Sequence, residues 1–99
     1  MALIYHITTE DAWEKAAGQG FYETPSLQDE GFIHCTHAHQ TQLVLEKYFK
    51  GVKDVVILTI DTEKLDVLLI EDWSPTLQDH FPHIYGYLFP GAVVAIKRA

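Results

Sequence analysis

The chain has 99 residues, of which 47% are hydrophobic and 21% are charged. Domains commonly have roughly 100–200 residues, so this length predicts one domain over residues 1–99. The balanced composition argues against wholesale disorder. Fourteen acidic and seven basic residues give a formal net charge of −7. Nucleic acids and anionic membranes favour basic surfaces, so neither is expected as a partner.

The only cysteine, Cys35, excludes an internal disulfide and a multi-cysteine zinc site. No apolar run approaches the roughly 18 residues that a membrane span requires. The segment Met1–Tyr5 lacks the basic n-region of a secretory signal. These features predict a cytoplasmic protein, and they leave its oligomeric state open.

Strands and helices alternate in the first half of the predicted structure. Residues 2–8 alternate in polarity and are rich in β-forming residues, which predicts a strand. Thr8 and Asp11 have the spacing of a capping box, and Gly18 and Gly20 end the helix that follows. The next elements are a connector at residues 21–30, a strand at 31–36 and a helix at 38–49.

The second half contains strands without crossover helices. Residues 54–61 include the short apolar run Val55–Leu58, which is typical of a central strand. The predicted order then continues with a turn or helical corner at 62–66, a strand at 67–70, a polar loop at 71–79, an extended or irregular segment at 80–88 and a strand at 92–96. This β-α-β-α-β-β-β-β order predicts an α+β fold with a mixed or antiparallel sheet and two helices.

A tripeptide of the form His-x-Thr occurs twice, once with His6 and Thr8 and once with His34 and Thr36. In a strand, residues two positions apart point to the same side. Each copy therefore presents an imidazole, which can transfer protons, beside a hydroxyl, which can donate a hydrogen bond. If the two strands are neighbours, both pairs converge on one cleft. The alternative is that each histidine is an ordinary half-buried sheet residue.

Two other groups of residues are candidates for a site. An extended backbone over Phe81–Gly86 places His83 and Tyr85 on one side, which is typical of a binding rim, although a structural turn explains the same residues. Glu71 and Asp72 follow an apolar strand, where most acidic residues are solvated loop charges.

Three histidines, His34, His37 and His39, surround Cys35 and raise the possibility of a metal site. Strand alternation places His34 and Cys35 on opposite faces, and His37 and His39 do not share a helical face. Solvated histidines near a helix start are the favoured interpretation, so no metal is expected. Cys35 is then a buried structural thiol.

These motifs resemble a bacterial family known as domain of unknown function 952. The resemblance depends on Ile4–Ile7, on Gly31–Thr36 with Gln40, and on Phe81–Gly86. It covers almost the whole chain, and the Gly-Phe-Ile-His and Phe-Pro-His-x-Tyr-Gly motifs are specific.

The family is similar in fold to the ADP-ribosyltransferase superfamily, whose members bind NAD in the cleft of a split β-sheet. The resemblance implies a split sheet here, with NAD or an ADP-ribose-like nucleotide as the small-molecule ligand. It implies that His6 holds the ribose and that His34 and Thr36 line the nicotinamide side. The candidate catalytic residues are then His34, Glu71 and His83, and the candidate ligand-binding residues are His6, Thr8, Thr36, Gln40 and Tyr85.

Two other functions stay open. Paired His-x-Thr tripeptides also resemble those of two-histidine phosphoesterases, whose imidazoles act as acid and base on a 2′,3′-cyclic phosphate. Their motifs are usually more widely separated than the two tripeptides of this chain. In ADP-ribosyltransferases a glutamate late in the chain stabilises the ribosyl cation. The lack of an obvious counterpart here favours a non-catalytic ligand-binding module.

Overall fold

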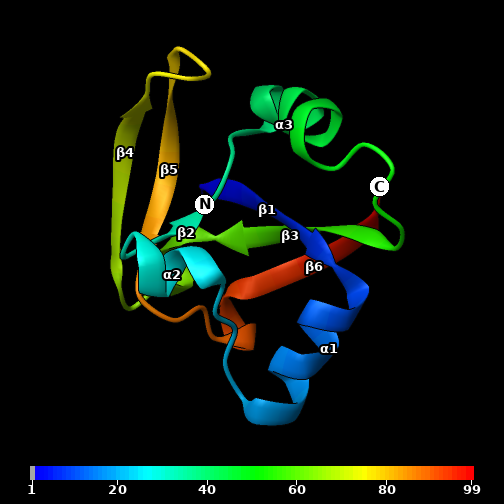
Figure 1. Cartoon of the computed structure of the whole chain (residues 1–99). Coiled ribbons are helices and arrows are strands. Elements are labelled where there is room, and N and C mark those ends of the chain that lie inside the picture. The colour runs from blue at the N-terminus through cyan, green and yellow to red at the C-terminus, as the bar shows by residue number, and fades with distance from the viewer. Residues whose placement is uncertain (1) are drawn as a thin grey trace.

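The computed structural model describes residues 2–99, so Met1 lies outside the description. Two antiparallel sheets of three strands each form the frame of the molecule (Figure 1). In the first sheet, β3 (Val55–Asp61) lies between β1 (Leu3–Thr9) and β6 (Val93–Arg98). In the second sheet, β5 (Asp79–Tyr85) lies between β2 (Ile33–His34) and β4 (Leu68–Ser74).

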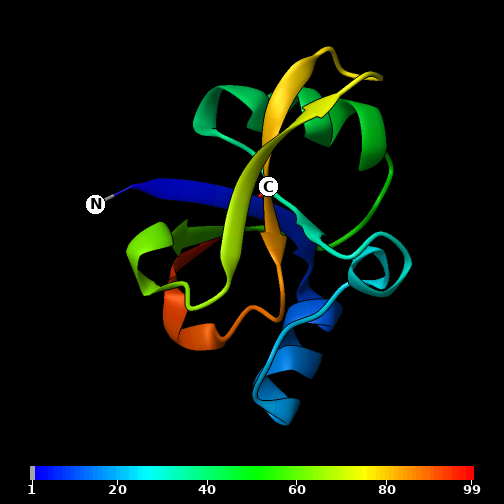
Figure 2. The ribbon, with the colours of Figure 1, turned by 90° about the vertical axis from the view of Figure 1, so that its left-hand side faces the viewer.

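Helices connect the strands of the first half. The described α-helices are α1 (Glu10–Gln19), α2 (Pro25–Asp29) and α3 (Thr41–Tyr48), and the short 3-10 turns are η1 (Ala38–Gln40), η2 (Thr62–Lys64) and η3 (Pro90–Ala92). In both ribbon views, α1 and α3 lie at opposite ends of the molecule (Figures 1 and 2). The predicted order of strands and helices is confirmed, with α2 as an addition inside the connector.

A two-way backbone bridge joins β1 to the segment that follows β2. The backbone N–H of Tyr5 in β1 donates to the carbonyl of Thr36 at 2.8 Å, and the N–H of Thr36 donates back to Tyr5 at 2.7 Å. The strands that carry the two His-x-Thr tripeptides are therefore neighbours. The predicted α+β class is confirmed, and all of the strand pairs are antiparallel across the described residues.

The hydrophobic core lies where both sheets turn their apolar faces inward. Leu58 and Ile60 of β3 are fully buried, as are Ile33 of β2 and Ile84 of β5. Burying a side chain of this size stabilises a fold by roughly 1.5–3 kcal/mol. As predicted, β3 is a central strand.

The helix α1 begins one residue later than predicted. Thr9, not Thr8, is the N-cap, and its hydroxyl accepts a hydrogen bond from the N–H of Ala12 at 3.3 Å. Because β1 extends to Thr9 and strand side chains alternate, Thr8 and Thr9 point to opposite faces. This shift leaves the Thr8 hydroxyl available to a different partner. The predicted end of the helix is confirmed, since Gly20 has a φ of 89° at the C-cap.

The polar loop predicted at residues 71–79 is wrong for most of its length. β4 continues to Ser74, pairs with β5 from end to end, and connects to it by a short turn. β4 is an edge strand, and its second half, Glu71–Ser74, is mostly polar with no buried residue, so its composition is typical of a loop. Tyr48 of α3 is 53% exposed.

Gly86 ends β5 at a point of close packing. A Cβ atom at this position would lie 2.6 Å from Cγ1 of Val67. The side chain of Val67 therefore requires a glycine at this position.

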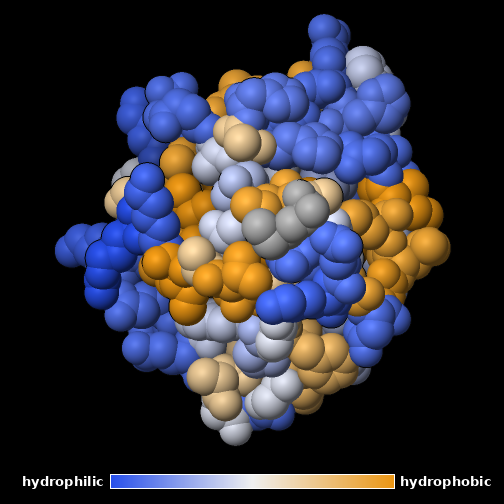
Figure 3. Space-filling view, turned by 180° about the vertical axis from the view of Figure 1, so that it is seen from behind, coloured by the Kyte–Doolittle hydropathy of each residue, from blue (hydrophilic) through white to orange (hydrophobic). Residues whose placement is uncertain are grey.

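Apolar residues also remain on the surface, among them Leu68, Trp73 and Ile96. Seen from behind, the apolar surface forms separate patches divided by hydrophilic residues (Figure 3). None of the helices described over residues 2–99 has the length and apolar character needed to span a membrane.

Candidate functional site

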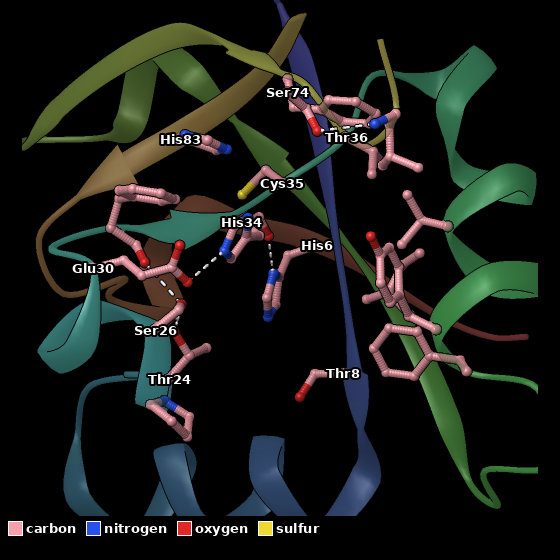
Figure 4. Close-up of a pocket in the computed structure, with 18 of the residues that line it drawn as sticks. His6, Thr8, Thr24, Ser26, Glu30, His34, Cys35, Thr36, Ser74 and His83 are labelled. Carbon is pink, nitrogen blue, oxygen red and sulfur yellow. Dashed lines mark hydrogen bonds and ion pairs between the residues drawn. The ribbon is translucent and has the colours of Figure 1, made fainter. Parts of the chain in front are cut away.

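A pocket of about 730 Å³ is lined by residues from both sheets and from the segments around α2 and α3. His6 and Thr8 of β1 face Thr24, Ser26 and Glu30 across its interior (Figure 4). A cavity of this size with a mainly apolar lining and a few converging polar groups is typical of a small-molecule site.

A chain of hydrogen bonds connects the first His-x-Thr tripeptide to Tyr22. Nδ1 of His6 donates to the backbone carbonyl of His34 at 2.5 Å, and Nε2 lies 2.7 Å from the Tyr22 hydroxyl. That hydroxyl also lies 2.8 Å from Oγ1 of Thr8. Because the carbonyl can only accept, a neutral His6 carries its proton on Nδ1 and accepts at Nε2. The Tyr22 proton then points to His6, and Thr8 donates to Tyr22.

Burial determines the protonation states of His6 and Tyr22. Desolvation lowers the pKa of His6 to about 4, against a smaller opposing effect of the His34 carbonyl. Desolvation also raises the pKa of Tyr22 to about 12. Both side chains are therefore neutral at pH 7, and His6 has no free nitrogen with which to bind a ligand directly.

His34 belongs to the more exposed part of the pocket. Its Nε2 donates to a carboxylate oxygen of Glu30 at 3.0 Å. Its ring lies edge-on to Phe32 and to His83, with centroids 4.9 Å and 5.0 Å away. Phe32 stacks on His83 with a centroid distance of 4.0 Å and an interplanar angle of 9°. Planar rings from β5 and from the segment that enters β2 thus form one wall.

A carboxylate stands behind His83. Nδ1 of His83 donates to Oδ2 of Asp72 at 2.8 Å, and the Tyr85 hydroxyl donates to the same oxygen at 2.5 Å. The bonds from Tyr85 and His83 lower the pKa of Asp72, so Asp72 is ionised, and the bond with Asp72 raises the pKa of Tyr85. Desolvation lowers the pKa of His83, and the hydrogen bond with Asp72 partly opposes that effect.

Of the residues predicted for the site, the structure brings several to the pocket and keeps others away. Lining it are His6, Thr8, His34, Thr36 and His83. Tyr85 does not line it, but its hydroxyl is bonded to Asp72 and its ring lies 5.3 Å from that of Phe32. The Thr36 hydroxyl lies 3.2 Å from that of Thr41, at the start of α3, and is not bonded to His34. β2 ends at His34, so strand alternation does not extend to Thr36.

Gln40 and Glu71 are not part of the pocket lining. Glu71 alternates with Asp72 along β4, and its carboxylate accepts from Nε2 of His37 at 2.7 Å. The Gln40 amide donates to Asp79 at 2.8 Å and to the carbonyl of His80 at 2.7 Å. These contacts tie the β4–β5 hairpin to the segment before α3, which is a structural role.

Three residues of the site, Tyr22, Glu30 and Phe32, were absent from the predicted set, and Asp72 was considered beside Glu71 but not chosen. Asp72 had a usable signal, because an extended β4 would have placed it on the same face as His83 and Glu71 on the other. Tyr22 had none, since its position depends on a two-way backbone bridge to Leu88, at 2.7 Å and 3.0 Å.

No group of three or more metal-ligating side chains occurs within residues 2–99. Nε2 of His37 is bonded to Glu71, and His39 lies 3.8 Å from Asp79. Cys35 is buried, and desolvation raises the pKa of its thiol far above neutral, as expected of a structural cysteine.

These features define a small α+β protein with a histidine-rich pocket beside the junction of two antiparallel sheets. A family model described as "Protein of unknown function (DUF952)" matches residues 7–96, and the chain belongs to this family. The resemblance to the family that the sequence motifs indicated is thereby confirmed.

Solved structures of the protein CC0527 from Caulobacter crescentus are similar to this chain. Its crystal structure has a TM-score of 0.88 at 31% identity, and the match covers 98% of this chain and 85% of that one. Its solution NMR structure has a TM-score of 0.82 at 32% identity, covering 97% and 83%. A crystal structure of a double mutant of the same protein has a TM-score of 0.87 at 30% identity, and the match covers 98% of this chain and 85% of that one. No curated protein matches the chain.

Proposed function

We propose that the pocket binds NAD or a closely related nucleotide, with the nicotinamide–ribose end inside it. The observation that carries this proposal is the convergence of both His-x-Thr strands on one pocket next to a wall of planar rings. The split-sheet frame is the arrangement that the resemblance to ADP-ribosyltransferases implies. That resemblance supports NAD as the ligand and an ADP-ribosyltransferase-like enzyme as the class.

Charge favours the nicotinamide end over the pyrophosphate. The described lining contains the carboxylates of Glu23 and Glu30 and no lysine or arginine. The nicotinamide ring of oxidised NAD is a cation, which these carboxylates attract, whereas phosphate groups favour basic side chains. The ring is expected to lie against Phe32 and His34, with the pyrophosphate toward solvent.

In this proposal Tyr22 and Thr8, and not His6, bind the ribose. Both ring nitrogens of His6 have protein partners, so the hydroxyls of Tyr22 and Thr8 are the groups available to a ribose hydroxyl. His6 then acts as the support that orients Tyr22. The phosphoesterase alternative needs both tripeptide imidazoles free, and this geometry gives it less support.

Titration calorimetry tests the proposal directly. Oxidised NAD is expected to bind more tightly than reduced NAD, by up to about fivefold, because a partly exposed charge pair contributes roughly 0.2–1 kcal/mol. Phe32→Ala and His34→Ala should weaken binding by about tenfold or more. His39→Ala is the matched control, since His39 is highly exposed and outside the pocket. Equal affinity of all three variants, or no binding at millimolar NAD, contradicts the proposal.

A further inference from the structure

Asp72, His83 and Tyr85 form a hydrogen-bonded cluster of the kind that supports a general base. Asp72 accepts from Nδ1 of His83 at 2.8 Å and from the Tyr85 hydroxyl at 2.5 Å. The ring of His83 is held further by stacking on Phe32. A histidine whose Nδ1 donates to a carboxylate has its lone pair on Nε2 and is fixed in orientation, as general bases require.

Nε2 of His83 is open to the pocket. No protein hydrogen bond engages it among the described residues, although the other nitrogen is bonded. Within the same residues, no buried polar side-chain atom lacks a partner. This nitrogen is therefore not completely buried, and His83 lines the pocket. A water molecule or a ligand group can reach it.

The pocket offers no activated nucleophile of its own. The Cys35 thiol is protonated at neutral pH, since burial raises its pKa. The hydroxyl of Ser26 donates to the carbonyl of Phe32 at 2.8 Å. Those of Thr8 and Thr36 are bonded to Tyr22 and Thr41. None of these four groups is an activated nucleophile, which favours a water molecule as the attacking group.

We propose that the Asp72–His83 pair activates a water molecule and that the pocket hydrolyses the glycosidic bond of the nucleotide it binds. This inference rests on the proposed NAD site. Nε2 of His83 takes a proton from water as the water oxygen bonds to C1′ of the ribose. The bond from C1′ to the ring nitrogen breaks, and its electron pair neutralises the nicotinamide ring. The products are nicotinamide, ADP-ribose and a proton that His83 passes to solvent.

Charged groups on three sides determine when His83 can act as a base. Desolvation has the largest effect and lowers its pKa; Asp72 of β4 and Glu30, which follows α2, oppose this, and His34 of β2 lowers the pKa further. The Tyr85 hydroxyl reaches Asp72 and not His83, and Phe32 is apolar. His83 is the catalytic residue and Asp72 a positioning residue. Loss of the Asp72 charge lowers the pKa of His83, so the rate should rise to its plateau at lower pH.

The test measures NAD affinity and nicotinamide release separately, in wild type, His83→Asn, Asp72→Asn and the control His39→Asn. Wild type and the control should release nicotinamide. His83→Asn should bind NAD but release nicotinamide about 100-fold more slowly or worse. Asp72→Asn, a second variant at a more exposed residue, should lower the plateau and shift the pH–rate inflection to lower pH.

The outcomes separate the two proposals. Binding without nicotinamide release in the wild type overturns hydrolysis and leaves the NAD site standing, as does release that is undiminished in His83→Asn. An unchanged inflection in Asp72→Asn overturns the role of the pair. Absence of NAD binding in every form overturns both proposals.

Discussion

His6 and His34, the histidines of the two His-x-Thr tripeptides, are joined by a hydrogen bond from the Nδ1 of one to the backbone carbonyl of the other, at 2.5 Å. The bond connects β1 to β2 beside the Tyr5–Thr36 backbone bridge. It makes the first histidine a structural support at the sheet junction and leaves the ring of the second for the pocket.

The stability of the protein should fall below pH 7 because of His6. The pKa of His6 is about 4 in the folded chain and near 6.5 when unfolded, so the unfolded state binds more protons between these values. The stability is fully present above pH 6.5 and is lost as the pH falls toward 4. His6 alone should lower the free energy of unfolding by about 2 kcal/mol between pH 7 and pH 5. Urea unfolding at both values measures this, and a pH dependence unchanged in His6→Asn contradicts it.

Replacement of Tyr22 by Phe should destabilise the fold by about 1–3 kcal/mol, because Nε2 of His6 and the Thr8 hydroxyl both lose their partner inside the protein. Tyr48→Phe is the matched control, since Tyr48 is 53% exposed. Equilibrium unfolding compares the two variants. Equal stability would mean that the Tyr22 hydroxyl is not a structural link.

Gly86→Ala should destabilise by about 1–3 kcal/mol, because the new methyl would overlap Val67. Val67→Ala in the same chain should restore part of the loss, since it removes the overlapping atoms. Gly91→Ala is the control, as a Cβ there meets nothing within 4 Å. Thermal unfolding measures the stability of each variant. If the losses of stability in the two single variants simply add in the double variant, the contact between residue 86 and Val67 is ruled out.

Neighbouring acids on β4 should behave differently when neutralised. Asp72→Asn should impair nicotinamide release, because Asp72 is bonded to His83. Glu71→Gln should retain it, because Glu71 is bonded to His37 outside the pocket. Side-by-side assays of the two purified variants compare them. The reverse pattern would restore Glu71 to the catalytic role that the sequence motifs indicate for it.

Local patterns predicted most of the fold because they depend on neighbouring residues. The apolar run Val55–Leu58 is the central part of β3, and the helices lie near their predicted positions. The edge strand β4 was missed because exposed edge residues resemble a loop. Without that strand, the face of Asp72 could not be distinguished from the face of Glu71.

The site was predictable where residues of one motif share a strand and not where distant segments meet. His6 with Thr8, and His83, follow from alternation along β1 and β5. Tyr22 enters the site through its bridge to Leu88, and Glu30 through α2, a helix inside a predicted connector. Neither contact has a local sequence signal.

The most direct test of the account is a two-dimensional NMR titration of the labelled protein with NAD, following amide and imidazole signals. The account predicts that the largest shifts occur at Thr8, Tyr22, Phe32, His34 and His83, around the pocket. Shifts confined to the residues around Gln40 and Glu71, or no shifts at millimolar NAD, would contradict it.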